Sequence, residues 1–158
     1  MATITKKFNP RNSVGSTPWG NAHGLLYTLA TAANGGAIGA DSLAPIAAAD
    51  KVRLGLIPAG SSLLDSQVIV STAFTAAVVG NLGFEYADGV DSAAVPQDAA
   101  YFGTALVLNA TGRLRNATAK APVTLPKDAW LVLTTAGATN AKAARLDVVL
   151  DVASEGTA

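Results

Sequence analysis

Residues 51–71, KVRLGLIPAGSSLLDSQVIVS, constrain the fold more than any other stretch of this sequence. Apolar and polar side chains alternate at its start, which is the period-two pattern of a strand in a pleated sheet. Pro58 cannot donate to a strand ladder and Gly60 can adopt a positive φ, so the tripeptide at 58–60 predicts a turn. The residues after it are apolar enough for a second strand. The side chains predicted to share one face of the first strand are Val52, Leu54 and Leu56.

The rest of the chain repeats this pattern of short apolar segments separated by turn residues. One segment, 96–102 (PQDAAYF), predicts a short helical turn instead, because proline opens it and a glycine follows it. Eight or nine short strands at this spacing predict an all-β fold, a two-sheet β-sandwich with jelly-roll connections. In the last strand, Leu146, Val148, Leu150 and Val152 are expected to face inward. The further segments predicted as strands are 24–33, 80–87, 104–109, 112–116, 121–125, 129–136 and 144–152.

Residues 1–24 differ in composition from the rest of the chain. Their prolines and glycines exclude a regular element of any length, although the segment also carries aromatic and basic residues. We therefore expect an extended N-terminal arm at 1–24 and a single β-sandwich domain at 25–158. Two interpretations of the arm remain open, a loosely packed terminus or an arm that becomes ordered on a neighbouring subunit. The candidate contact residues of the arm are Lys6, Phe8, Arg11 and Trp19.

Charge is scarce in this sequence. Only 14% of the 158 residues are charged and the formal net charge is zero, whereas about 25% is usual for a soluble domain. This composition favours a chain whose surface is partly covered by copies of itself or by a partner, with a low-charge exposed surface as the alternative. Nucleic acid is not an expected partner, because a basic stripe is missing. No membrane span is predicted, since the longest apolar region, 25–49, is interrupted by polar residues. No signal peptide is predicted either, since the N-terminus has no apolar run after its two lysines.

The sequence offers little for catalysis. It has no cysteine, which excludes disulfides, thiolate metal sites and thiol nucleophiles. His23 is the single histidine and lies in an irregular segment, so we expect a surface or interface residue and not a catalytic base. Glu85, Asp88 and Asp91 lie close together in the sequence but lack the calcium-loop pattern, so a turn with solvated acids is expected. We predict no catalytic residues, no metal and no cofactor.

Two arginines form the nearest approach to a basic patch. Arg113 and Arg115 are two apart in a predicted strand, so their side chains share one face. No aromatic side chain suited to base stacking stands beside them in the sequence. We therefore expect them to pair with carboxylates on a protein neighbour.

Five stretches together resemble the capsid decoration, or cement, proteins of tailed bacteriophages. The resemblance implies a non-enzymatic protein that binds the outside of the assembled head as a homodimer or homotrimer, across the joints between capsomers. It further implies that the major capsid protein is the partner and that the protein, made in the host cytoplasm, resides on the capsid exterior. The five stretches are FNPRNSVGSTPWGNA, GADS, VRLGLIPAGSSLLDSQVIVS, LGFEYADGVDSAAVPQDAAYFG and LPKDAWLVLTTAG.

Two alternatives stay open beside this resemblance. One is a tail or fibre-attachment protein of the virion. The other is a carbohydrate-binding module of the sandwich type, which would need a row of exposed aromatic side chains, such as Trp130 with Tyr86 or Tyr101. The position of Trp130 in the middle of an apolar strand predicts a place in the core instead.

Overall fold

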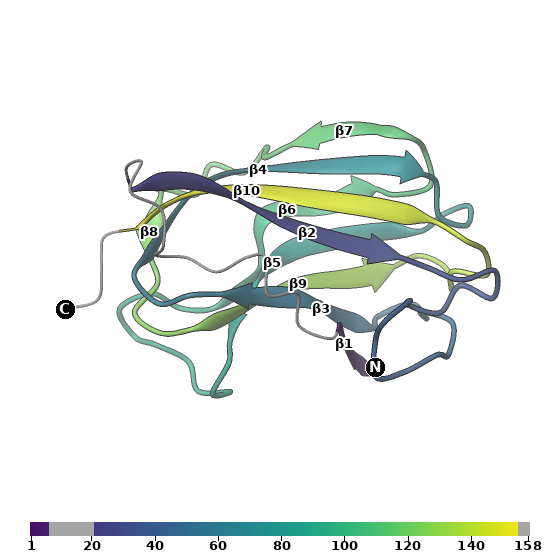
Figure 1. Ribbon diagram of the computed structural model, residues 1–158, viewed down its shortest axis with the longest axis horizontal. Coiled ribbons are helices and arrows are strands. Elements are labelled where there is room, and N and C mark those ends of the chain that lie inside the picture. Colours follow the sequence, from purple (N-terminus) through teal and green to yellow (C-terminus); the bar gives the residue numbers. More distant parts are fainter. Residues whose placement is uncertain (7–20, 155–158) are drawn as a thin grey trace.

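The computed structural model describes residues 1–6 and 21–154, and these residues form ten strands and no helix (Figure 1). The predicted all-β class is therefore confirmed. None of the described residues belongs to a helix that could cross a membrane. The strands are β1 (Thr3–Thr5), β2 (Ala22–Ala30), β3 (Lys51–Ile57), β4 (Ser61–Thr72), β5 (Val79–Tyr86), β6 (Asp98–Val107), β7 (Gly112–Arg115), β8 (Val123–Thr124), β9 (Ala129–Ala136) and β10 (Arg145–Ser154).

The strands form two sheets that pack face to face (Figure 1). One sheet has the order β1-β3-β9-β5-β6 and the other the order β2-β10-β4-β7, with β8 paired to β4. Without the short β1 and β8, each sheet has four strands. Successive strands then alternate between the sheets, except for β5 and β6, which pair within one. This strand order is that of a jelly roll, so the predicted sandwich and its connections are confirmed.

The core lies between the sheets and is built by alternation along each strand. The predicted inward side chains of β10 are at most 1% exposed, and β5 buries its apolar face in the same way. Aromatic rings fill one end of this core, where Phe84 contacts Tyr86 and Tyr101 edge to face at 5.9 and 5.5 Å between ring centroids. Such pairs add stability beyond the area they bury.

The turn predicted at 58–60 is confirmed, because Gly60 has a φ of 75°. The strands that it joins, β3 and β4, belong to different sheets, so the chain crosses the core at this corner. The predicted face of β3 is only partly correct. A bulge between Arg53 and Gly55 shifts the alternation, so Ile57 is buried and Leu56 is only half-buried. Such a bulge reverses the side-chain phase for the rest of the strand.

The helical turn predicted for 96–102 is wrong. Strand β6 begins at Asp98 and pairs with β5. The Asp98 carboxylate accepts a hydrogen bond from the amide of Ala100 at 2.8 Å, and both Tyr101 and Phe102 are buried. A single helical turn has little stability of its own, so packing of these two rings determines the local structure.

Two described segments fall within the range expected to form the extended arm. Residues 3–5 form β1, and β2 begins at Ala22. The arm residues Phe8, Arg11 and Trp19 lie outside the described residues. Lys6 is described and lies at the end of β1.

Candidate interaction surfaces

The first candidate surface is the site that holds β1, which we call the strand groove and define as residues 38–41 and 50–53. Strand β1 runs parallel to β3, with Thr3 opposite Lys51 and Ile4 opposite Val52. The Ile4 side chain is 2% exposed and is part of the hydrophobic core. Burying a side chain of this size contributes about 1.5–3 kcal/mol.

Two carboxylates of the strand groove bind the backbone of the N-terminal segment. Asp50 is 6% exposed and accepts hydrogen bonds from the amides of Ala2 at 2.7 Å and Ala47 at 2.9 Å. Asp41 accepts a hydrogen bond from the amide of Thr5 at 3.0 Å, and its own amide donates to the Thr5 carbonyl at 3.1 Å. Hydrogen bonds to ionised acceptors are stronger than those between neutral groups. The segment is thus held by directional contacts on both of its sides.

Lys6, a predicted contact residue, closes the strand groove. Its amide donates to the carbonyl of Arg53 at 3.0 Å, and its ammonium donates to the carbonyl of Ile38 at 2.9 Å. Partial burial lowers the pKa of the Lys6 ammonium. The side chain therefore contacts its own domain in this structure, and its predicted contact with a neighbouring subunit stays a prediction.

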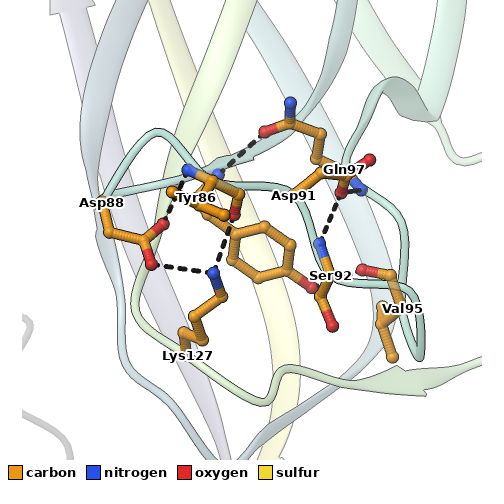
Figure 2. Close-up of polar contacts among 8 residues, drawn as sticks. Tyr86, Asp88, Asp91, Ser92, Val95, Gln97 and Lys127 are labelled. Atoms are coloured by element: carbon orange, nitrogen blue, oxygen red, sulfur yellow. Dashed lines mark hydrogen bonds and ion pairs between the residues drawn. The ribbon is translucent and has the colours of Figure 1, made fainter.

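The second candidate surface is the 87–97 loop, which joins β5 to β6 and projects from the end of the sandwich (Figure 1). Figure 2 shows how Lys127 reaches the loop from beneath the Tyr86 ring. The Lys127 ammonium donates to Asp88 Oδ2 and to the Val90 carbonyl, each at 2.7 Å, and lies 4.8 Å from the Tyr86 ring centroid. The Lys127 ammonium lowers the pKa of the Asp88 carboxyl. One cation thus holds the tip of the loop.

The base of the same loop is fixed by two further groups (Figure 2). Asp91 Oδ1 accepts hydrogen bonds from the amides of Ser92 and Gln97 at 2.8 and 2.7 Å. The Tyr86 hydroxyl donates to the Val95 carbonyl at 2.5 Å. The loop is therefore preorganised, and it presents an apolar residue, Val90, which is 61% exposed. Preorganisation lowers the entropic cost of binding a partner.

The third candidate surface is the connection between β2 and β3, which carries two exposed apolar side chains. Ile38 is 52% and Leu43 76% exposed. They border a hollow of about 450 Å³ whose walls are almost entirely apolar. The residues that line the hollow are Ala32, Ala33, Asn34, Gly36, Ala37, Ile38, Gly39 and Leu43.

A buried amide keeps this connection in place. Asn140 is 1% exposed, and its side-chain nitrogen donates to Thr31 Oγ1 at 3.1 Å and to the Gly35 carbonyl at 3.3 Å. Its side-chain oxygen accepts hydrogen bonds from the amide and hydroxyl of Thr75 at 3.1 and 3.2 Å. Gly35 adopts a φ of 85°, and a Cβ there would lie 1.9 Å from the Asn140 carbonyl oxygen, so only glycine fits. The hollow is accordingly formed by a fixed backbone.

Arg113 and Arg115 lie on β7, an edge strand, opposite Ile69 and Gln67 of β4. Arg115 forms an ion pair with Asp65 at 3.0 Å and is 72% exposed, and Arg113 donates to the Gln67 side chain at 2.8 Å. Both arginines are therefore partnered within their own sheet. Exposed pairs of this kind contribute little stability, so they can exchange partners at an interface.

The acidic residues of 85–91 do not form one cluster. Glu85 lies on the outer face of its sheet between Lys51 and Arg53, with N–O distances of 3.0 and 2.7 Å. Asp88 pairs with Lys127 in the loop, and Asp91 binds loop amides. Within residues 1–6 and 21–154, no three His, Cys, Asp or Glu residues gather in a way that could hold a metal ion. The expected turn with solvated acids is thus correct for the loop, whereas Glu85 is a partly buried ion-pair partner.

The aromatic row required by a carbohydrate-binding module is not formed by the described candidates. Tyr86 and Tyr101 are 1% and 6% exposed. Trp130 is not in the core, which corrects the sequence-based expectation. It is half-buried on the outer face of β9, where the Arg53 guanidinium lies 5.6 Å from the centroid of its ring. Strand alternation explains this position, since its neighbours Leu131 and Ala129 face inward.

Sequence reasoning missed the strand groove and the apolar hollow. Asp41 and Asp50 bind backbone amides of the N-terminal segment that lie 36 and 48 residues away in the sequence. The run of alanine and glycine from 32 to 40 was visible, yet its shape depends on Asn140, which is distant in the sequence. No local sequence pattern indicates the contacts of the two aspartates or the dependence of the hollow on Asn140.

The fold is similar to that of chains in solved phage capsids. A chain in a structure described as the capsid of Ralstonia phage GP4 gives a TM-score of 0.66 at 16% identity, covering 99% of this chain and 100% of that one. A chain of the Cyanophage Pam1 capsid asymmetric unit gives 0.59 at 14% identity, covering 90% and 92%. At these identities the likeness establishes a common fold. No protein-family model and no curated protein sequence matches this chain.

Proposed function

We propose that this protein is a non-enzymatic virion component of a tailed phage that binds the outside of the assembled head and bridges capsid subunits. The observation that carries the proposal is the fold likeness to a chain of a phage capsid structure over nearly the full length of both chains. The resemblance of the five sequence stretches to cement proteins supports the same role independently. The partners would be the major capsid protein and further copies of this chain, as a dimer or trimer.

The surface chemistry supports adhesion. The 87–97 loop and the connection between β2 and β3 lie at opposite ends of the sandwich (Figure 1). The loop carries the exposed Val90, and the connection carries the exposed Ile38 and Leu43. A capsid presents the same few sites many times over. An oligomer that contacts several of them gains from effective concentration, so modest single contacts add up to durable attachment. Such a protein stabilises a shell without any chemical step.

The proposed contact residues are Lys6, Phe8, Arg11, Trp19, Arg113 and Arg115. Aromatic and arginine side chains dominate the energetics of protein interfaces, which supports the choice of Phe8, Arg11 and Trp19. Arg113 and Arg115 are exposed on an edge strand, where carboxylates of a neighbour could replace their present partners.

The test is occupancy on purified heads that lack the protein, measured by co-sedimentation and imaged by electron microscopy. We expect saturable binding to the head surface, and we expect the free protein to have the mass of a dimer or trimer. The triple variant Phe8→Ala, Arg11→Ala, Trp19→Ala should bind at least tenfold more weakly, whereas Lys142→Ala, an exposed control, should bind normally.

Different results would contradict different parts of the proposal. Labelling confined to tails or fibres would favour the alternative virion role. A monomer without affinity for heads would contradict the role itself. Unchanged binding of the triple variant would exclude the arm from the contact while leaving the capsid role intact.

A further inference from the structure

Strand β1 is bound to the sandwich in the way that an extended peptide ligand is bound. The eight strands of the jelly roll are complete without it. Its pairing with β3 is parallel, whereas all other ladders among the described strands are antiparallel. An extended segment added to the edge of a finished sheet is the geometry of β-augmentation, in which main-chain hydrogen bonds give affinity and side-chain pockets give specificity.

The hydrogen bonds between residues 2–6 and the rest of the described domain are made by the strand groove. Asp50 and Asp41 accept hydrogen bonds from amides of the segment, and the carbonyls of Arg53 and Ile38 accept from Lys6. The Ile4 side chain is buried in the core. The strand groove would therefore bind residues 2–6 of any copy of this chain with the same set of contacts.

The length of chain between β1 and β2 permits such an exchange. The fourteen residues 7–20 can span at most about 50 Å when fully extended. The longest strand of the sandwich, β4, has 12 residues and so measures about 40 Å. The connection can accordingly reach from one copy to a neighbour whose strand groove lies within the length of one domain.

We propose that β1 is exchanged between neighbouring copies, so that residues 2–6 of one chain occupy the strand groove of the next. The proposal rests on the proposed function, because it requires copies held side by side. A short linker gives an effective concentration in the millimolar range for binding within one chain, and adjacent copies in an oligomer present their strands at a similar concentration. Exchange then replaces the contacts between residues 2–6 and the strand groove of the same chain by identical contacts with the next chain. It therefore costs little free energy and links the copies to one another.

The absence of cysteine from the sequence gives a direct test, because any disulfide must join introduced residues. Thr3 and Lys51 are register partners on one face of the sheet, so the double variant Thr3→Cys, Lys51→Cys places two thiols within bonding reach. The variant is oxidised both free and bound to heads, then analysed by non-reducing electrophoresis and by mass spectrometry of the linked peptide. We expect covalent dimers or trimers joined through positions 3 and 51.

A mixing experiment excludes chance collisions. Single variants Thr3→Cys and Lys51→Cys are unfolded together, refolded in equal amounts and oxidised, and we expect a linked heterodimer. The matched control pairs Thr3→Cys with Thr104→Cys, an exposed position on β6 at the opposite edge of the same sheet. A heterodimer yield no higher than that of the control pair would overturn the exchange.

Occupancy on heads tests the proposed function separately from the exchange. If the double variant gives only monomers with an internal disulfide, both free and on heads, the exchange is wrong. Normal occupancy of those monomers on heads would then leave the capsid role standing. Cross-linked oligomers that do not bind to heads would support the exchange and contradict the capsid role.

Discussion

At the scale of single residues, the structure depends on a few polar groups that connect distant segments. Asn140 joins three connections at one end of the sandwich, and Asp50 joins the N-terminal segment to the start of β3. Both are almost fully buried. A buried polar group with every partner in place specifies one arrangement of the backbone, and removal of its partner leaves other groups unpaired.

Replacing Asn140 by alanine should therefore lower the free energy of unfolding by about 2–3 kcal/mol, since Thr75 and Gly35 lose a buried partner. A chain of this size loses about 2–4 °C in melting temperature per kcal/mol. Urea unfolding and a thermal melt measure the effect. The matched control, Asn109→Ala, removes an exposed amide and should change stability by less than about 0.5 kcal/mol. Equal effects of the two changes would contradict the structural role given to Asn140.

At the scale of elements, the sequence predicts what depends on local pattern. The alternation in β5 and β10 and the glycine turn at 58–60 were predictable, because period two and positive φ leave a signature in neighbouring residues. The bulge in β3 and the strand at 98–102 were not, because both follow from contacts made across the sandwich. The candidate contact residues likewise divide into features that a local pattern predicts and features that depend on distant contacts. The shared face of Arg113 and Arg115 was predictable, but their partners Gln67 and Asp65 lie 46 and 50 residues away.

The pairing of β5 with β6 gives a prediction at this scale. A Cβ on Gly83 would lie 2.0 Å from the Asp98 carbonyl oxygen, so Gly83→Ala must push the two strands apart. We expect a loss of about 1–3 kcal/mol, as for other overpacked sites. Gly112→Ala is the control, since no atom lies within 4 Å of the added methyl group and alanine suits a strand better than glycine. Chemical denaturation of both variants checks the prediction, which fails if Gly83→Ala is as stable as the wild type.

At the scale of the whole molecule, many of the scarce charges among the described residues form ion pairs, and the strength of these pairs depends on pH. Burial alone would raise the pKa of Glu85, but hydrogen bonds from Arg53 and Lys51 outweigh it, and the pKa lies below its ordinary value of 4.5. The pKa values of Asp98 and Asp147 are lowered in the same way, against burial, chiefly by the Ala100 amide with Lys120 for Asp98 and by Arg145 with Thr28 for Asp147. A carboxyl whose folded pKa is depressed adds stability above its unfolded pKa, and this stability disappears as the pH falls through the folded value.

We therefore expect the melting temperature to be steady above pH 5 and to fall as the pH is lowered from 5 towards 3. Glu85→Gln should be less stable than the wild type at pH 7, because Lys51 and Arg53 lose their anionic partner. The difference should narrow as the pH falls from 4.5 towards the lowered pKa of the folded protein, because the wild-type carboxyl is protonated first in the unfolded state and only at lower pH in the folded state. Thermal melts of both proteins at half-unit intervals test this. Curves that remain parallel down to pH 3 would show that Glu85 contributes nothing to the acid response.

The order of strands in the two sheets has a consequence for synthesis. Strand β9 lies between β3 and β5, and β10 lies between β2 and β4, so the middle of each sheet is filled by one of the last two strands to be translated. A nascent chain on the ribosome can close neither sheet before these strands emerge, and until then it exposes the edges of β3 and β5 and of β2 and β4. The finished domain must then form in one late, cooperative event, and growing chains held close together on a polysome have every opportunity to pair with the wrong neighbour.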